Sequence, residues 1–451
     1  MQRRSHCSSD RARTRVQTSP WSPHESSGVP DEATLAEAWI LTTEAGRRLL
    51  AEIATLRSIG PSDLERFRKL APPAAVSAAI RLSRAREKAR EKFEHGERMW
   101  VEPTGVEQAT SEPVARHKAA RFQCPLVVDL CAGIGGDALA LATRSEVLAV
   151  DLDPGMCRRI QYNAAIYGVS SRVLPVRARA ETFTIPTDAW LHLDPDRRAI
   201  SRGRARSLDL YAPGPGFWES AARRVAAGAI KLSPASDFSK HFGGPEYEVE
   251  LISLRGECKE ATLWFGELVS CRRRATRLPE NVTWTDRDGP TMERAPVSRL
   301  STLIYDPDPS LLRAGLLDGF ALKHQLSRIG DSVDYLTADH LVSTPFLTAF
   351  LVQEVSPLDL KRLRRMMARN EIGTLEIKVR GVDIAPETLR PRLGLRGARA
   401  ASLFLIGGTG PARAVLAQRT STGGSTTSST AGTPGAGELT SGAGPFPPAS
   451  A

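Results

Sequence analysis

The sequence predicts an α/β protein in which helices flank a parallel β-sheet, with a helical domain before the sheet and a small α+β domain after it. From about residue 121, a buried-strand pattern, a glycine-rich turn, a helical pattern and a second buried-strand pattern follow one another. This order is the opening of a βαβ unit, whose two strands lie parallel in one sheet. Helical periodicity precedes the unit, and mixed helix and strand patterns follow it.

These patterns divide the chain into five segments. Residues 1–30 and 419–451 are expected to be disordered, because neither can bury enough apolar surface to offset the entropy lost on ordering. Between them we expect a helical domain over 31–120, a sheet domain over 121–299, and a mixed region over 300–418 that ends in the α+β domain.

The helical domain is predicted from apolar residues at near-helical spacing and from a later run of strong helix formers. The later run also carries basic residues that could contact nucleic acid, but interleaved glutamates favour a solvated helix face. The apolar residues are Leu35, Ile40, Leu41, Leu49, Leu50 and Ile53, and the basic ones are Arg81, Arg84, Arg86, Lys88, Arg90 and Lys92.

Short apolar segments bounded by turn residues predict the strands of the sheet. In the last region, Leu375, Ile377 and Val379 alternate with charged residues, as in a half-exposed strand. The predicted sheet strands are "PLVVDL", "VLAVDL", "AWLHLD" and "AIKLS", a closing hairpin is "EVELISLRGECKEATLWFGEL", and the later strands are "IGTLEIKVRGVDI" and "ASLFLIGG".

The composition restricts the class of protein. A chain of 451 residues with 41% hydrophobic content is long enough for two or three domains. Without an apolar run of about 18 residues or a signal-peptide core, we expect no membrane association and a cytoplasmic location. The six cysteines form no CxxC pair and the eight histidines form no cluster, so we expect reduced thiols and no metal site. The formal charge of +10 favours a polyanionic partner such as RNA.

The most informative stretch is "DLCAGIGGDALAL", followed by "AVDLDP". Gly133, Gly135 and Gly136 let the backbone turn sharply and approach a ligand. Asp151 ends the second strand, 18 positions after Gly133, where an acid can hydrogen-bond both hydroxyls of an adenosine ribose. This spacing suits a dinucleotide or S-adenosylmethionine. The alternative is a purely structural role, in which the glycines only pack a helix against a strand.

The charge of this region favours one ligand class. Gly133-x-Gly135-x-x-Ala138 satisfies the dinucleotide fingerprint GxGxxG/A. A cluster of acids would repel a pyrophosphate, however, and suits the cationic sulfonium and ammonium groups of S-adenosylmethionine. We therefore expect S-adenosylmethionine as the cofactor, and the acids concerned are Asp129, Asp137, Asp151, Asp153 and Asp194.

The run "VVDLCAGIGGDALALA…VLAVDLDPGMCRRIQYNAAIYGV" resembles the front half of class I S-adenosylmethionine-dependent methyltransferases, in particular the trimethylguanosine-synthase-like branch. Segments including "EQATSEPVARHKAARF", "GECKEATLWFGEL" and "YLTADHLVSTPF" resemble bacterial methyltransferases with a C-terminal THUMP-like domain. The resemblance implies a Rossmann-like methyltransferase sheet, with Asp153 and Pro154 beginning the second helix. It implies that Asp129, Gly133, Gly135 and Gly136 hold the methionine end of the cofactor and that Asp151 holds the ribose.

The loop "HLDPDRRA" is expected to face the acceptor. Amino-group methyltransferases of this fold carry [Asp/Asn/Ser]-Pro-Pro-[Tyr/Phe/Trp] there, and this chain keeps only the first two positions, Asp194 and Pro195. We expect Asp194 to orient or deprotonate the acceptor, and Arg197 and Arg198 to recognise an anionic part of the substrate. The alternative is an internal ion-pair network between Asp194 or Asp196 and the two arginines.

Near the C-terminus, "SPLDLKRLRRMMARN" predicts a helix with Ser356 as N-cap and Pro357 at its first position. Basic residues at i, i+4 and i+8 form a stripe that can track phosphates, although a plain solvated face is an alternative. The resemblance to THUMP-like domains implies binding of structured RNA. The basic stripe consists of Lys361, Arg365 and Arg369, and the apolar face of Leu360, Leu363 and Met367.

The leading hypothesis is therefore an S-adenosylmethionine-dependent methyltransferase that acts on RNA. A second hypothesis keeps the enzyme but gives it a small-molecule or protein acceptor, because the usual aromatic residue is missing at position 197. A third is a module that binds the cofactor or RNA without turnover.

Overall fold

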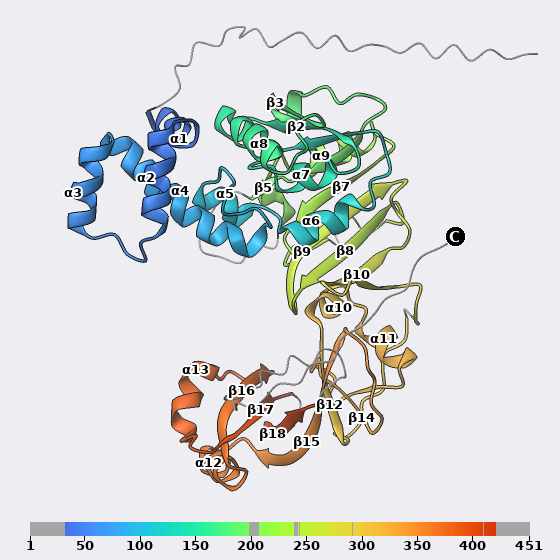
Figure 1. The fold of residues 1–451 in the computed structure, drawn as a ribbon. Helices are drawn as coiled ribbons and strands as arrows, with labels where there is room; N and C mark the ends of the chain where they lie inside the picture. The colour runs from blue at the N-terminus through green and yellow to red at the C-terminus, as the bar shows by residue number, and fades with distance from the viewer. Residues whose placement is uncertain are drawn as a thin grey trace, which may run out of the picture. The chain divides into compact units, whose positions relative to one another are not determined.

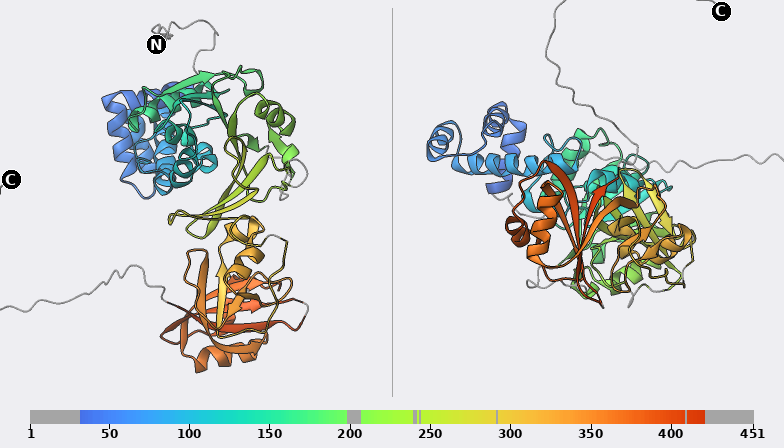
Figure 2. Two further views of the ribbon diagram at one scale, coloured as in Figure 1. Left: turned by 90° about the vertical axis from the view of Figure 1, so that its right-hand side faces the viewer. Right: turned by 90° about the horizontal axis from the view of Figure 1, so that it is seen from below.

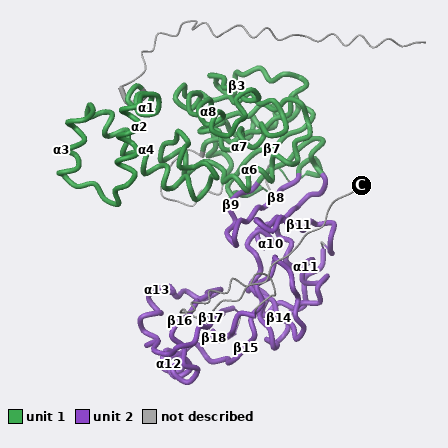
Figure 3. The backbone as a smooth tube through the Cα atoms, viewed as in Figure 1, with its two compact units in different colours: residues 1–247, 262–269 green, residues 248–261, 270–451 purple. Residues whose placement is uncertain are grey.

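The computed structural model describes residues 32–197, 207–238, 242, 244–290, 292–408 and 410–420, with the side chains of 32–34 and 197 left out. The predicted disordered segments lie outside these residues, except for 419 and 420. The chain forms two compact units (Figure 3), namely residues 1–247 with 262–269 and residues 248–261 with 270–451. The predicted domain boundaries at 120/121 and 299/300 remain predictions, since the compact units divide the chain elsewhere.

The first unit begins with four helices, α1 (Glu32–Thr42), α2 (Glu44–Ala54), α3 (Pro61–Leu70) and α4 (Pro73–Lys92). Thr43 separates the first two, because its side chain accepts a hydrogen bond from the Gly46 backbone and caps α2. A Cβ at Gly46 would lie 2.5 Å from the Ile40 Cα, so α1 and α2 pack closely only with glycine here. The predicted apolar positions are buried except Leu35, which is 52% exposed.

Two basic residues of α4 bind neighbouring backbone instead of solvent. Arg86 donates to the carbonyl oxygens of Met99 (2.8 Å) and Arg98 (2.8 Å). Lys92 donates to three carbonyl oxygens, including that of Val106 at 2.6 Å. The prediction of a solvated face is therefore wrong for these two residues, because satisfying exposed carbonyl groups draws their side chains onto the next segment.

The nine-stranded sheet has parallel pairs where the βαβ pattern predicts them, and one more parallel pair, β8–β10, beyond that pattern. The pairs β1–β2, β1–β4, β2–β3 and β4–β7 are all parallel. The strand order is β11-β10-β8-β9-β7-β4-β1-β2-β3. The strands are β1 (Leu126–Leu130), β2 (Glu146–Asp151), β3 (Val173–Arg177), β4 (Trp190–Leu193), β7 (Ala227–Leu232), β8 (Tyr247–Leu254), β9 (Glu257–Gly266), β10 (Arg273–Leu278) and β11 (Val282–Thr285).

Further helices of the first unit connect or accompany these strands (Figure 1). One hydrophobic core runs from α1–α4 into the sheet, and includes Ile40, Phe67 and Ala78 together with Val127 and Trp264. The N-terminal helices thus share one continuous core with the sheet and the helices around it. The helices are α5 (Pro103–Gln108), α6 (Glu112–Ala119), α7 (Gly136–Leu141), α8 (Pro154–Ile166) and α9 (Pro215–Ala222), and a short ribbon pairs β5 (Asp196–Arg197) with β6 (Tyr211–Ala212).

The second unit contains a seven-stranded mixed sheet in the order β13-β14-β12-β15-β18-β17-β16. Helices α12 (Leu360–Arg369) and α13 (Pro386–Leu389) lie against β16 (Figure 2), and α10 (Pro309–Arg313) and α11 (Leu317–Lys323) precede them in the chain. The strands are β12 (Leu303–Pro307), β13 (Ser327–Arg328), β14 (Leu336–Ala338), β15 (Leu347–Pro357), β16 (Ile372–Arg380), β17 (Arg399–Ile406) and β18 (Arg413–Arg419).

The start of α12 differs from the prediction. Asp359 is the N-cap, with its side chain accepting from the Arg362 backbone at 2.9 Å, whereas Ser356 and Pro357 end β15. Pro357 pairs with Arg413 of β18, and this sheet pairing keeps the residues extended up to the cap. The fold class is confirmed: a helical N-terminal part, a Rossmann-like sheet and a small α+β part. Among the described residues, no helix is long and apolar enough to span a bilayer.

Candidate active site

The loop between β1 and α7 forms the floor of the candidate cofactor site. Gly133 has a φ of +56° and nothing lies within 4 Å of where its Cβ would stand, so open space adjoins the backbone. Gly135 has a φ of +92°, which favours glycine. A Cβ at Gly136 would lie 3.2 Å from the Thr110 carbonyl oxygen, so this glycine permits a close approach to the α5–α6 connection.

Asp151 and this loop fix each other's positions. The Gly133 backbone N–H donates to Asp151 Oδ2 at 2.9 Å, and the Asp153 N–H donates to Oδ1 at 2.9 Å. Burial raises the pKa of Asp151, and these two hydrogen bonds oppose that rise. Asp153 caps α8, which begins at Pro154, so the predicted start of this helix is confirmed. The carboxylate therefore stands at the carboxyl end of β2, beside the glycine loop.

A buried polar network lies behind the loop. Lys118 Nζ lies 2.8 Å from Asp137 Oδ1 and 3.3 Å from His192 Nε2. His192 Nδ1 lies 2.7 Å from Asp129 Oδ1, and the Thr110 hydroxyl donates to Asp137 Oδ2 at 2.6 Å. Lys118, Asp129 and His192 are each at most 1% exposed. We call these five residues the buried network.

In the buried network, neighbouring charges shift the pKa values of Asp137 and His192 against the effect of burial. Burial alone acts to raise the pKa of Asp137, but the charges of Lys118, His192 and Lys231 outweigh it and hold that pKa below its ordinary value. Burial acts to lower the pKa of His192, but the carboxylates of Asp137 and Asp129 reverse this and raise it. Two carboxylates thus face an ammonium and an imidazole, and protonation of His192 makes the network neutral.

Asp194 lies at the carboxyl end of β4, where its backbone N–H donates to the Leu130 carbonyl of β1 at 3.1 Å. Its Oδ2 lies 2.7 Å from Lys231 Nζ on β7, and Lys231 also donates to the Gln108 carbonyl oxygen at 2.8 Å. The Asp194 side chain retains 29% of its exposure, so it can be reached from solvent. Burial raises the pKa of Asp194, and the Lys231 charge opposes this without cancelling it.

The rest of the predicted acceptor loop is only partly described. Pro195 is buried, and Asp196 Oδ1 accepts from Gln108 Nε2 at 3.2 Å. The backbone of Arg197 lies in β5, but its side chain and all of Arg198 lie outside the described residues. Asp194 is ion-paired, as the alternative interpretation required, but its partner Lys231 was not among the two arginines considered there.

The residues present fit S-adenosylmethionine. The buried Asp129 Oδ2 has no hydrogen-bond partner within the described part of the chain, so it remains an acceptor. The space at Gly133 leaves room for a ligand against the backbone, and Asp151 presents its carboxylate at the end of β2. An unpartnered carboxylate oxygen and a second carboxylate beside open backbone space suit a ligand with ammonium and hydroxyl donors.

Cys131, within the same loop, is unsuited to nucleophilic chemistry. Burial raises the pKa of its thiol well above the ordinary value, and the carboxylates of Asp151 and Asp194 act in the same direction. The thiol therefore stays protonated at neutral pH.

Sequence reasoning missed the cations of this site. Lys118 and Lys231 were not singled out, nor was His192, although it lies two residues before Asp194 and so on the same face of the strand. A lysine inside the apolar strand "AIKLS" was a readable signal for Lys231. Lys118 lies on α6, within the segment "EQATSEPVARHKAARF". The family resemblance included this segment but assigned no role to any residue in it.

The basic stripe belongs to the second unit and is exposed. Lys361 and Arg365 lie on the outer face of α12, while Leu363, Met366 and Met367 are buried beneath it. Arg369 pairs with Glu354 of β15 and keeps 66% of its exposure. The stripe therefore exists as a surface, with one of its three charges partly neutralised.

Comparisons with known proteins identify the family of the chain and its domains. A family model described as RNA cap guanine-N2 methyltransferase matches residues 124–250, and one described as THUMP domain-like matches residues 347–419. Two uncharacterized S-adenosylmethionine-dependent methyltransferases of Mycobacterium tuberculosis, from strains CDC 1551 / Oshkosh and ATCC 25618 / H37Rv, are each 34% identical over 299 residues. These residues make up 65% of this chain and 80% of each relative.

One solved structure shares the fold over nearly its whole length. The crystal structure of a Porphyromonas gingivalis W83 protein proposed to be a methyltransferase has a TM-score of 0.66 at 15% identity. The match covers 86% of this chain and 98% of that one. Together these findings confirm the predicted methyltransferase domain and C-terminal THUMP-like domain.

Proposed function

Because the chain belongs to the S-adenosylmethionine-dependent methyltransferases, we propose that it methylates RNA and that its acceptor is the exocyclic amino group of a guanine. The family confirms two predictions from the sequence, namely that the protein is a methyltransferase and that S-adenosylmethionine is its cofactor. Asp129, Gly133, Gly135 and Gly136 would hold the methionine end of the cofactor, and Asp151 the ribose.

The observation that carries the proposal is the ion pair of Asp194 and Lys231 at the end of β4, with 2.7 Å between Oδ2 and Nζ. When bound, S-adenosylmethionine supplies a methyl group on a cationic sulfur. Asp194 accepts a hydrogen bond from the acceptor amine and then takes up the proton that the methylated nitrogen loses. Lys231 holds the carboxylate in one orientation, and positioning is the larger part of such a transfer.

RNA as the acceptor is supported by two family matches and by the basic stripe on α12. Residues 124–250 match a family described by its action on the guanine N2 of an RNA cap, and residues 347–419 match a THUMP-like family. The basic stripe on α12 can contact phosphates. Arg197 and Arg198 are proposed contacts to an anionic part of the same substrate, because a guanidinium can stack on a base or clamp a phosphate.

The test is methyl transfer from tritium-labelled S-adenosylmethionine by the full-length protein to undermethylated cell extract. RNA, protein and small molecules are then separated and counted, and labelled RNA is digested to identify the nucleoside. We expect label in N2-methylguanosine. Label in protein or small molecules would replace RNA as the acceptor, and cofactor binding without label in any fraction would indicate a non-catalytic module.

The role of Asp194 is tested separately with Asp194→Asn, which keeps the shape of the side chain and removes its basicity. We expect methyl transfer to fall by about 10²- to 10⁴-fold, with the Kd of the cofactor unchanged. The matched control is Asp188→Asn, an exposed aspartate six positions upstream. Undiminished transfer by Asp194→Asn would remove this residue from the mechanism.

A further inference from the structure

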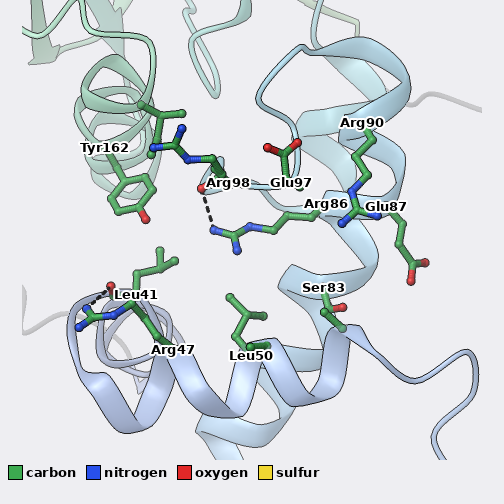
Figure 4. Close-up of a pocket in the computed structure, with 13 residues that line it drawn as sticks. Leu41, Arg47, Leu50, Ser83, Arg86, Glu87, Arg90, Glu97, Arg98 and Tyr162 are labelled. Atoms are coloured by element: carbon green, nitrogen blue, oxygen red, sulfur yellow. Dashed lines mark hydrogen bonds between the residues drawn. The ribbon is translucent and has the colours of Figure 1, made fainter. Parts of the chain in front are cut away.

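A pocket lies in the first unit, among α2, α4 and α8 and the segment that follows α4 (Figure 4). Its volume of about 460 Å³ falls within the range of small-molecule sites, roughly 300–1,000 Å³. It shares no residue with the candidate active site. The lining residues used below are Leu50, Arg86, Arg90, Glu97, Arg98 and Tyr162.

The lining has an excess of positive charge. Four arginines and two glutamates line the pocket, which leaves two positive charges. Glu87 is engaged by Arg84, which lies 3.4 Å away and is not part of the lining. Within the described residues, neither Arg90 nor Arg98 has an ion pair of its own, and both are exposed. The lining therefore carries more guanidinium groups than carboxylates, which favours the binding of an anion.

Arg86 gives the pocket a fixed cationic wall. Its guanidinium is held by the carbonyl oxygens of Met99 and Arg98, each at 2.8 Å, and Figure 4 shows it extending between Tyr162 and Arg90. Burial lowers the pKa of Arg86, and the charge of Arg90 acts in the same direction while Tyr162 and Glu97 oppose it. Arg86 is thus a cation held in place by backbone carbonyl groups, and it faces the pocket with a fixed positive charge.

The other side of the pocket suits a planar ring. Tyr162 of α8 lies there, and its ring is braced edge-on by Trp100 at 5.9 Å between centroids. Leu41, Leu50 and Ile166 supply aliphatic surface. An aromatic face beside aliphatic side chains favours a flat, partly apolar group, which a simple inorganic anion lacks.

We propose that this pocket binds a nucleoside phosphate, with the exposed Arg90 or Arg98 on the phosphate and Tyr162 and Leu50 against the base. The fork of a single guanidinium group matches two oxygens of a phosphate. Glu97 supplies an acceptor for a base amino group or a ribose hydroxyl. The phosphate group can come from a free nucleotide or from an RNA strand, and both sources present the same chemistry to the arginines.

The test is isothermal titration of the full-length protein, without cofactor, using four probes: guanosine monophosphate, adenosine monophosphate, inorganic phosphate and a short 5′-phosphorylated oligoribonucleotide. The variant is Arg90→Ala with Arg98→Ala, both exposed, so the fold should survive. The matched control is Arg81→Ala, an exposed arginine of the same helix outside the lining. Thermal unfolding of each variant verifies its fold.

We expect saturable binding of at least one nucleotide probe, with its Kd raised at least about tenfold in the double variant and unchanged in Arg81→Ala. Binding of the mononucleotides indicates a free nucleotide, whereas binding of the oligoribonucleotide alone indicates a strand. No saturable binding, equal binding by the double variant, or binding of inorganic phosphate as tight as that of the nucleotides would each overturn the proposal. Because no methyl transfer is measured, the result is independent of the proposed RNA methylation.

Discussion

Charged residues serve the candidate active site and helix α12 in opposite settings. In the first, Lys118, His192 and Asp129 are at most 1% exposed and each contacts a charged neighbour within 3.3 Å. On α12, Arg369 keeps 66% of its exposure even though it pairs with Glu354. Buried charges depend on partners in fixed places, whereas exposed ones interact mainly with water and dissolved ions.

This contrast predicts how much a single substitution should change stability or binding in each setting. Removing one member of a buried pair leaves the other without water or partner, so single substitutions should be costly in the sheet. Exposed cations act together on a polyanion and depend on salt, so single substitutions on α12 should be mild. The following variants test this difference, from the largest expected effect to the smallest.

Lys118→Met should have the largest effect, because it leaves the buried Asp137 carboxylate without its closest cation. We expect the free energy of unfolding to fall by about 3–5 kcal/mol, measured by urea denaturation at neutral pH. The double variant Lys118→Met with Asp137→Asn should recover part of this loss, since the orphaned charge is gone. An unaffected single variant would show that the buried network does not behave as a set of coupled charges.

Lys231→Met should change the pH dependence of methyl transfer. The pKa of Asp194 lies above its ordinary value, and Lys231 opposes that rise, so removing the lysine should raise the pKa further. If the ionised carboxylate is needed, activity is lost as pH falls through this pKa. The acid limb of kcat/KM should therefore move up by about 1–3 pH units. Lys69→Met, an exposed lysine on α3, is the control, and an unmoved acid limb would disconnect Lys231 from the reaction.

Gly133→Ala should weaken cofactor binding by about tenfold, because the new Cβ would occupy the open space beside the loop that we assign to the cofactor. The φ of +56° at this position also costs a non-glycine residue roughly 1–2 kcal/mol. Gly168→Ala is a matched control, with a φ of +70° and equally open surroundings after α8. Both variants carry the same backbone strain. Equal cofactor Kd values, measured by titration, would mean that the space at Gly133 is not the cofactor's.

Neutralising the basic stripe should have the smallest effect per residue. Lys361→Ala, Arg365→Ala and Arg369→Ala together should reduce the slope of log affinity against log salt by about 2–3 for RNA binding. Arg369 should contribute least, because Glu354 already pairs with it. The control is a triple variant that removes the same charge elsewhere, namely Arg68→Ala, Lys69→Ala and Arg81→Ala. A similar loss of slope in this control would show that only the overall charge of the protein matters.

The sequence predicted those parts of the structure that depend on local pattern. The glycine loop, Asp151 and the apolar strands are legible because turn geometry and burial periodicity are properties of neighbouring residues. The pairing of His192 with Asp129 joins positions 63 apart in the chain, and that of Lys118 with His192 joins positions 74 apart. Such contacts follow from strand order and helix packing, so no local pattern identifies the partner.

The start of α12 shows the same limit on a smaller scale. Ser356 and Pro357 have the residue types of a helix start, and so does Asp359 three positions later. The pairing of β15 with β18, which extends to Pro357 and Arg413, decides between them. Local propensity offers candidates for an element boundary, and the sheet selects one.

The segment from the end of α5 to α6 limits how the sheet could be exchanged between proteins by recombination. This short stretch supplies the Gln108 carbonyl that Lys231 contacts and the Thr110 hydroxyl on Asp137, and Lys118 follows on α6. A recombination breakpoint at residue 121, where the βαβ pattern begins, would leave every strand of the sheet intact. It would, however, replace these three groups with the corresponding residues of another protein. A chimera that takes this sheet from one protein into another should therefore keep α5 and α6 with it to preserve these contacts.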